Sequence, residues 1–488
     1  KIKKQSRMTN FYMFGAQLIA IVAVFYVTKP SVLVPTVWTD PNPLPEMSGV
    51  LSPNQLLAKE NVKYVHGDFG GPESTAIDPE TGIVYASLND GTVASFYGSG
   101  EELKVKERII FSPANFVHRH NEEQSTNHII WCREQRKSGK IPWHPPTEQK
   151  CGRPLGLRYR KEADKHFLYV LDAYYGLFKL NVDTKEVEHV FNESTPIQSV
   201  ANSDVTLTAG IKFFNDLDIL DNGNIVFTDT SYKHTRSENR QELLDAAPRS
   251  RLFLYDVTEK TLQVKLCGLH FGNGVQIMPK REGQSNNEVI VADSARFRLL
   301  RVNLDADFLQ GTSSLADSLS SPSSSHVTAF SSCGEKGSLY EMLKTNKYEV
   351  TGVRVFTDSL PGFADNIRLD IPQTSSENFY LVGLGTASKK PFSLLWFLYQ
   401  TPVWIRDVIG KFVPMKFVEK LVPKYGLAIV VNAQGKIVSS LHDATGEGSA
   451  FVSQVERHPI TGDLWLGSHS EPRLVLVPHE NLPARWEG

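Results

Sequence analysis

The chain has 488 residues, 41% of them hydrophobic, and this length permits one large β domain or two to three smaller domains. The formal net charge of -2 gives no electrostatic reason to expect nucleic acid or another polyanion as a partner. Four cysteines are too few for a disulfide scaffold, which excludes the small disulfide-rich class of proteins.

The first thirty residues have the pattern of a signal anchor. Four basic residues precede an uncharged apolar run from Phe11 to Val27, and no acidic residue occurs before Asp40. Because a basic flank stays in the cytoplasm, this asymmetry predicts a type II single-pass protein of the plasma membrane or endoplasmic reticulum, with the remaining chain lumenal or extracellular. A cleaved signal peptide is the competing interpretation, but no small-x-small site follows the run at Thr28-Lys29-Pro30. A buried core helix is disfavoured by the position at the N-terminus.

Beyond a Pro-rich stretch from Pro30 to Pro53, the chain repeats one theme. A strand that ends in small or polar residues is followed by a turn and a second strand, as in GIVYASLNDGTVASF and EVIVADSARFRLLRVNL, and six such units occur. Each unit predicts a sheet of about four short strands, which cannot bury its own face alone. Six sheets stacked around an axis bury those faces, so we expect a six-bladed β-propeller whose unequal spacing indicates inserts and not WD40 repeats.

We therefore expect an all-β chain with a short helical insert. Its expected parts are a cytoplasmic tail at 1–10, a signal-anchor transmembrane helix at 11–28, an extended tether at 29–55, and a propeller at 56–488 that contains a Ser-rich insert at 311–338 and an amphipathic helical insert at 389–424. The Ser-rich insert has too little apolar content to offset the entropy of ordering, so we expect a flexible, exposed loop there.

Phe116 to Lys150 is expected to be a similar loop. It carries His118, His120, His128 and His144, whose spacings match no standard zinc pattern, so surface histidines are favoured over a metal site. Cys132 and Cys151 flank a polar part of this stretch and could staple it in an oxidising compartment. In a lumenal chain, Asn192 is the candidate glycosylation site, because Asn192-Glu193-Ser194 is the only sequon in the sequence.

The segment from Lys389 to Lys424 combines large apolar side chains with basic ones. Its basic residues are Lys389, Lys390, Arg406, Lys411, Lys416, Lys420 and Lys424, against only Asp407 and Glu419 as acids. A cap over the propeller channel explains this composition without a membrane. A pair of interfacial helices is the alternative, because aromatic residues with flanking lysines are typical of segments that lie among lipid headgroups. The cap and the interfacial helices are compatible interpretations if the segment is a lid that admits apolar substrates from lipid.

Polar residues interrupt the apolar sequence where four blades begin: Glu73, Asn215, Asn273 and the pair Asp365-Asn366. The innermost strands of a propeller open at one end of the central channel, so these side chains are expected to converge there. Five or more oxygens with two carboxylates suit Ca²⁺. The alternative is that each amide ties two blades together through backbone hydrogen bonds, but the recurrence in four blades favours the metal site. Asp216 is expected to orient its loop through backbone amides instead.

Four motifs carry a resemblance to a known family. CGRPLGLR, FNDLDI followed by GNIVFTDTS, FGNGVQI and LPGFADNIR occur in this order and resemble the strictosidine synthase-like branch of the six-bladed calcium-dependent propellers. The likeness covers almost the whole chain. It implies a central cation held by Glu73, Asn215, Asn273 and Asp365, weak hydrolysis of the arylesterase type, and a loop disulfide between Cys132 and Cys151.

Two departures from that family restrict the reaction. Strictosidine synthases carry a catalytic glutamate where this chain has Ser453, which cannot deprotonate an amine near neutral pH, so alkaloid synthesis is not expected. The related paraoxonases use a histidine where this chain has Arg153 to Gly156, so no imidazole is expected there. Ester hydrolysis would then depend on the cation to polarise the carbonyl, with Asp365 or a metal-activated water as nucleophile or base and Asn215 as a second candidate catalytic residue.

Two classes of function remain open. The first is a membrane-tethered, calcium-dependent hydrolase of arylesterase or lactonase type that acts on small apolar esters or lactones. The second is a non-catalytic propeller that binds a ligand or a protein partner and keeps a structural cation. All four cation positions are retained, which favours the enzyme, while the missing histidine and glutamate favour the binding protein. Hydrolysis measured with and without a chelator separates the two.

Overall fold

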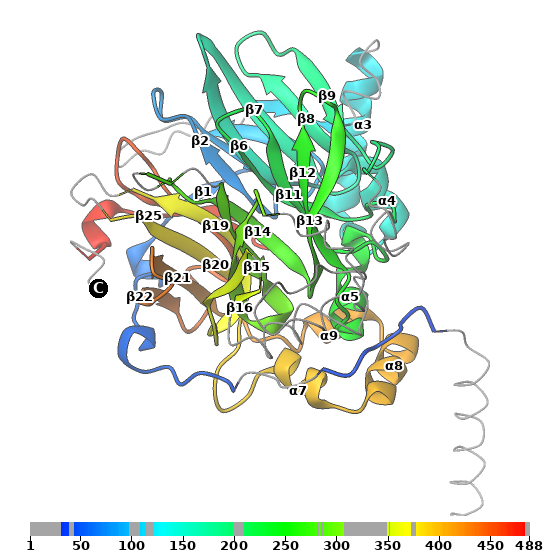
Figure 1. Ribbon diagram of the computed structural model, residues 1–488, viewed down its shortest axis with the longest axis vertical. Helices are drawn as coiled ribbons and strands as arrows, with labels where there is room; N and C mark the ends of the chain where they lie inside the picture. Colours follow the sequence, from blue (N-terminus) through cyan, green and yellow to red (C-terminus); the bar gives the residue numbers. More distant parts are fainter. Residues whose placement is uncertain are drawn as a thin grey trace, which may run out of the picture.

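The computed structural model describes residues 31–38, 43–96, 108–113, 122–198, 209–280, 283–284, 287–306, 349–350, 352–371 and 377–483. Six β-sheets make up most of this part of the chain, and several helices gather at one end of them (Figure 1). The predicted cytoplasmic tail, the signal anchor and the Ser-rich insert lie outside these residues. Of the helices in the described ranges, none is long and apolar enough to cross a membrane.

Each sheet is antiparallel, and its strands follow one another outward from the innermost strand. The first sheet contains β2 Thr75–Ile77, β3 Val84–Ser87, β4 Val93–Phe96 and β5 Arg108–Phe111. The second contains β6 Pro154–Glu162, β7 Lys165–Asp172, β8 Gly176–Asn181 and β9 Val187–Phe191. The third contains β10 Phe214–Ile219, β11 Ile225–Asp229, β12 Ser250–Asp256 and β13 Thr261–Leu269. The fourth sheet contains β14 Gly272–Ile277, β15 Glu288–Asp293, β16 Arg298–Asn303, β18 Val353–Thr357 and β17 Glu349–Val350. The fifth contains β19 Gly362–Asp370, β20 Phe379–Ala387, β21 Gly426–Asn432 and β22 Ile437–Asp443. The sixth contains β23 Val452–Arg457, β24 Leu464–Ser468, β25 Arg473–Val477 and β1 Lys63–His66.

The ring of sheets is closed by the earliest strand of the described chain. β1 pairs with β25, with Tyr64 opposite Val475, so the last sheet is completed by residues from the opposite end of the sequence. Neighbouring sheets pack through apolar faces, and Val226, Val291 and Leu300 lie in one fully buried cluster between the third and fourth sheets. The prediction of a six-bladed, mostly β propeller is confirmed.

The stretch from Phe116 to Lys150 is not the exposed loop that the sequence predicts. Its described part forms α3 Glu122–Lys137 and α4 Pro145–Cys151. The two helices are joined by the disulfide Cys132–Cys151, which confirms that pairing. Arg133 also reaches the buried carboxylate of Asp90, at 3.3 Å. The sequence does not predict α3 because its amphipathic pattern is weak. The disulfide and this ion pair fix the helix to the propeller, a role that a broad apolar face has in most surface helices.

Histidines of this stretch make local contacts. His128 Nε2 lies 3.2 Å from the carbonyl oxygen of Lys150, and His144 Nδ1 lies 2.6 Å from Thr147 Oγ1. Although His128 lies close to Cys132 and Cys151, both sulfurs are used in the disulfide, so these three residues form no metal site. His118 and His120 lie outside the described residues.

Residues 31–38, here called the strap, are extended as expected of a Pro-rich segment but are docked on the propeller. The main-chain N–H of Val34 donates to Asp245 Oδ1 at 2.6 Å, and that of Thr36 donates to the Asp245 carbonyl at 2.8 Å. Leu33 and Trp38 are buried. The strap is therefore part of the folded domain and not a free spacer. The 3₁₀ turns η1 Gly49–Leu51 and η2 Lys59–Asn61 follow before β1.

Residues 389–424, here called the cap, connect β20 to β21. They form α7 Leu394–Gln400, α8 Val403–Phe412 and α9 Met415–Glu419. The cap packs beside α5 Asn239–Asp245, which follows η4 Arg236–Glu238 between β11 and β12, and the strap runs next to α8 (Figure 1). Two further turns, η5 Ser294–Arg296 and η6 His479–Asn481, lie elsewhere in the propeller.

Candidate functional site

Three inner strands are interrupted by a β-bulge at corresponding positions. The irregularities lie between Phe214 and Leu217 of β10, Gly272 and Val275 of β14, and Ala364 and Ile367 of β19. Each therefore contains one of the predicted donors Asn215, Asn273 and Asp365. A bulge takes a residue out of the regular ladder and redirects its side chain. This accounts for polar side chains in otherwise apolar inner strands.

A phenylalanine lies two residues before each of these donors. Phe213, Phe271 and Phe363 precede Asn215, Asn273 and Asp365, and Phe451 stands in the same relation to Ser453 in the last sheet. The Phe213 and Phe271 rings meet edge to face at 6.0 Å between centroids, and Phe271 and Phe363 do so at 5.1 Å. Phe271 and Phe451 have φ angles of 60° and 53°, a backbone conformation that costs a bulky residue about 1–2 kcal/mol. These four phenylalanines are here called the aromatic collar, and all four line the same cavity as the polar residues.

A cavity of about 230 Å³ lies between the cap and the inner strands. Its polar floor is made by four of the predicted donors, Glu73, Asn215, Asn273 and Asp365, and its walls include all four collar phenylalanines. The cap contributes mostly apolar side chains to the opposite wall, among them Leu394, Leu398, Met415, Val418 and Val422. The predicted convergence of donors from four blades is thus what the folded chain shows.

Two buried amide oxygens, one at this floor and one next to the floor residue Asp365 in the sequence of β19, have no hydrogen-bond partner among the described residues. Asn273 and Asn366 are almost fully buried, and the Oδ1 atom of each is unpaired. The Nδ2 group of Asn215 donates to Thr230 Oγ1 at 2.7 Å, which fixes the orientation of that amide. Asn366 packs against Gly274 of the neighbouring strand and is not among the cavity-lining residues. A buried oxygen without a partner costs about 1–3 kcal/mol, so a hydrogen-bond donor or a cation is expected beside Asn273.

The carboxylates of the floor point to the same conclusion. Burial raises the pKa of Asp365 well above its usual range, and the nearby carboxylates of Glu73 and Asp216 add to the shift. Two acidic groups that repel each other beside unpaired amide oxygens form a donor set suited to a hard divalent cation such as Ca²⁺. The residues present therefore fit the predicted ion.

Two arginines lie beside the carboxylate of Glu73 at the floor. Arg153, which is fully buried, lies with Nη2 2.5 Å from Glu73 Oε2 and also donates to the carbonyl of Gly71 at 3.1 Å. Arg236 lies 3.8 Å from the same Glu73 oxygen and pairs with Glu148 at 2.8 Å. The site thus has fixed positive charge next to its carboxylates.

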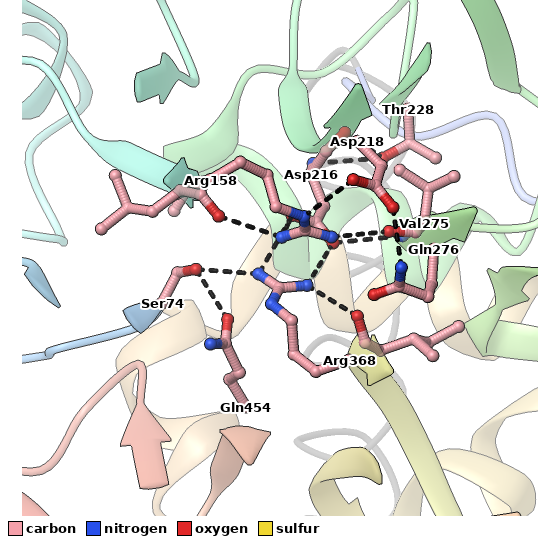
Figure 2. Close-up of polar contacts among 12 residues, drawn as sticks. Ser74, Arg158, Asp216, Asp218, Thr228, Val275, Gln276, Arg368 and Gln454 are labelled. Carbon is pink, nitrogen blue, oxygen red and sulfur yellow. Dashed lines mark hydrogen bonds and ion pairs between the residues drawn. The ribbon is translucent and has the colours of Figure 1, made fainter. Parts of the chain in front are cut away.

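Asp216 belongs to a separate polar network in the channel, drawn in Figure 2. It accepts hydrogen bonds from Arg368 at 2.9 Å and from the main-chain N–H of Val275 at 3.1 Å. Arg158 lies 3.4 Å from its other oxygen, and Arg368 reaches on to Ser74 Oγ at 3.0 Å. These contacts join residues from β6, β10, β14 and β19 with the start of the first blade. The backbone amide that Asp216 contacts thus belongs to the neighbouring blade and not to its own loop, and two arginines contact its carboxylate in addition.

His469 also lines the cavity, although no motif in the sequence marks it as a site residue. It follows β24, and its ring packs against Phe451 with the centroids 5.7 Å apart. Burial lowers the pKa of His469 well below its usual range, and Arg240, Arg236 and Arg153 add to the shift, so the imidazole is neutral at pH 7. The hydroxyl of Ser453 donates to the Glu73 carbonyl at 2.5 Å, and Ser453 is not among the cavity-lining residues.

Comparison with known proteins gives a consistent assignment. The family model described as Strictosidine synthase matches residues 215–306. Adipocyte plasma membrane-associated protein from Bos taurus is 32% identical over 445 residues, which cover 90% of this chain and 84% of the relative. The protein of that name from Rattus norvegicus is 32% identical over 440 residues, covering 90% and 91%.

A plant protein and a solved structure are more distant. Protein STRICTOSIDINE SYNTHASE-LIKE 10 from Arabidopsis thaliana is 28% identical over 444 residues, covering 88% of this chain and 91% of the relative. The structure of a gluconolactonase from Xanthomonas campestris is 10% identical, with a TM-score of 0.44, and the match covers 92% of this chain and 99% of that one.

Proposed function

The chain belongs to the adipocyte plasma membrane-associated protein family, and from that premise we propose that its cavity is the active site of a calcium-dependent hydrolase of small apolar esters or lactones. The observation that carries this proposal is the lining of the cavity, which combines the aromatic collar with acidic and amide oxygens from four blades. The collar favours an apolar body, and the polar floor lies where the reactive group of such a substrate would point.

Glu73, Asn215, Asn273 and Asp365 would hold Ca²⁺ in this proposal. A bound calcium ion would polarise the carbonyl of the substrate and stabilise the negative charge that develops on its oxygen. The unpaired Oδ1 of Asn273 and the repulsion between the carboxylates of Glu73 and Asp365 support this assignment.

The remaining roles belong to the residues around the floor. The phenylalanines of the collar bind the apolar part of the substrate and exclude bulk water. Neutral His469 accepts the proton of the attacking water, a role that Asp365 fills less well because its raised pKa favours the protonated acid without a cation. Arg236 supplies fixed positive charge beside the floor.

A non-catalytic propeller with a structural cation is the second candidate, and the ion pair between Arg153 and Glu73 favours it. An arginine at 2.5 Å already neutralises one of the four ligands. In that case the cavity would hold a ligand without turning it over.

Hydrolysis of a panel of aryl esters and lactones by the purified full chain, with and without chelator, tests the proposal. We expect about one tightly held calcium per chain and activity that chelation removes. Asp365→Asn should lose calcium and hydrolysis together. Asp370→Asn, which alters a similarly buried carboxylate at the other end of β19, is the matched control and should keep both. Calcium binding without hydrolysis of any ester or lactone would favour the binding protein.

We also propose that the propeller is lumenal or extracellular. The disulfide Cys132–Cys151 supports this location, because disulfides persist in oxidising compartments. Asn192 lies in a partly exposed turn, where its side chain accepts from the N–H of Ser194 at 2.8 Å, and is the proposed glycosylation site. Protease digestion of sealed microsomes should leave the propeller intact until detergent is added, and degradation without detergent would show the opposite topology.

A further inference from the structure

The outer surface of the cap is apolar although it faces away from the propeller. Trp404 is 61% exposed, Phe417 50% and Leu421 68%. The inner surface of the same helices is apolar too, since Ile409 and Met415 pack with the buried side chains of Leu33 and Leu398. A helix that is apolar on both sides is expected to be covered on both sides. The structure therefore leaves one side of the cap to be covered by something outside the described chain.

The strap extends this exposed surface. Val32, Val34 and Val37 are 63%, 61% and 72% exposed, while Leu33 between them is buried against the cap. The hydroxyl of Ser31 donates to Asp407 of α8, and the side chain of Arg406 donates to the carbonyl of Thr36. The strap and the outer side of α8 and α9, here called the apolar face, are thus joined by specific contacts.

The position of the strap limits how far the apolar face can lie from a membrane. The predicted signal anchor ends at residue 28, and Ser31 already contacts α8. The intervening residues can span at most about 10 Å when fully extended. If the tether were free, the propeller could lie anywhere above the bilayer, but docking of the strap removes that freedom.

Charge around the apolar face indicates which kind of surface covers it. Lys416, Lys420 and Lys424 are exposed, and the ammonium groups of Lys416 and Lys420 lie 5.5 Å and 5.8 Å from the centre of the Phe417 ring. Lysines that flank exposed aromatic rings bind anionic lipid headgroups while the rings enter the acyl boundary.

We infer that the apolar face lies in the surface of an anionic lipid bilayer, with the mouth of the cavity beside it. Phe392, which precedes α7 in the cap, lines the cavity and is 58% exposed, so the cavity wall reaches the surface of the cap. Apolar ligands therefore reach the cavity from the lipid and not from bulk water. This inference concerns the orientation of the domain, so it holds whether or not the cavity is hydrolytic.

Photolabelling of the full chain tests the inference. The protein is reconstituted at one chain per nanodisc, in phosphatidylcholine with or without phosphatidylserine, together with a phosphatidylcholine that carries a diazirine on its acyl chain. We expect label on the peptides that contain Trp404 and Phe417, at least fivefold above that on Ile371 and Ile460, which are 61% and 56% exposed elsewhere on the propeller. Phosphatidylserine should increase this label, and changing Lys416, Lys420 and Lys424 to Gln should remove the increase.

Other outcomes overturn it. Label on the cap no higher than on Ile371 would show that the apolar face is not in the bilayer. If the cap is protected from hydrogen exchange only at two chains per disc, a second copy covers the face instead. The variant Trp404→Ser/Phe417→Ser should lower label on neighbouring cap residues, and its unfolding temperature in detergent should match that of Ile371→Ser, which excludes misfolding as the cause.

Discussion

Arg153 and Glu73 form a buried ion pair at the floor of the cavity, with Arg153 Nη2 2.5 Å from Glu73 Oε2. Arg153 precedes β6 of the second blade, while Glu73 precedes β2 of the first. The arginine lies in the segment where the sequence predicts no imidazole. It therefore sets the charge of the site: a cation that binds at Glu73 must compete with a guanidinium already in contact with that carboxylate.

Replacement of Arg153 by Met should separate the contribution of this ion pair to stability from its competition with calcium at Glu73. Without calcium, the variant leaves Glu73 as a buried carboxylate with only the more distant Arg236, at 3.8 Å, to compensate it, and we expect the free energy of unfolding to fall by about 3 kcal/mol. With calcium, Glu73 gains a cation without competition, so calcium should raise the melting temperature more in the variant than in the wild type. Thermal melts with calcium and with chelator measure both effects. Equal calcium shifts in the two proteins would contradict the proposed metal role of Glu73, and Arg153→Lys, which keeps the charge, serves as the control.

Gly410 should tolerate no side chain although it lies inside α8. Alanine is normally favoured over glycine in a helix by about 1 kcal/mol. Here a Cβ at Gly410 would lie 2.2 Å from Leu33 Cδ1, so the strap would have to move away. We expect Gly410→Ala to increase hydrogen exchange in residues 31–38 and to lower stability. Leu33→Ala removes the clash, so the double variant should be less affected than the sum of the single changes. Unchanged exchange of the strap in Gly410→Ala would show that Leu33 does not hold it.

The sequence predicted the blades and the convergence of donors better than it predicted the surroundings of the site. Asn215, Asn273 and Asp365 each break an apolar strand, and a propeller brings such positions together. The phenylalanine two residues before each donor was visible in the same motifs and would have predicted the collar. Arg153 and His469 could not be found this way, because their roles depend on which sheets become neighbours when β1 closes the ring.

The helices were harder to predict for a different reason. The composition of the cap indicated a short helical insert, but α3 is mostly polar and is held by a disulfide and by ion pairs to Asp90. Docking of the strap likewise rests on main-chain hydrogen bonds to Asp245, which no periodicity of residues 31–38 reveals.

His442 should make the fold sensitive to mild acid. Its ring is buried between Tyr425 and Ser440, with Nδ1 3.0 Å from the Tyr425 hydroxyl. Burial lowers the pKa of His442 to about 4, and Lys389 adds to the shift. Between pH 6.5 and 4 the unfolded chain therefore binds a proton that the folded chain does not, so stability falls as pH falls through this window and is fully present above it.

Denaturant titrations across that pH range test this contribution. The slope of unfolding free energy against pH reports the protons taken up on unfolding, and His442→Gln should reduce that number by up to about one near pH 5. Tyr425→Phe keeps the imidazole and loses only its hydroxyl partner, so it should lower stability without removing the slope. An unchanged slope in His442→Gln would assign the acid sensitivity to other groups.

His469 provides the most direct test of whether the cavity is catalytic. It lines the cavity, packs against Phe451 at 5.7 Å between ring centroids, and is uncharged at neutral pH. If it accepts the proton of the attacking water, His469→Ala should lower kcat by about 100-fold or more and leave KM and the calcium content nearly unchanged. Added imidazole should restore part of kcat, because the variant leaves the space of the missing ring open to the cavity. Phe451→Leu removes the ring that packs against His469 but keeps the imidazole, so its loss should be smaller and insensitive to imidazole. A merely structural histidine would show neither the separation of kcat from KM nor the rescue, and a wild-type kcat in His469→Ala would remove this residue from the mechanism.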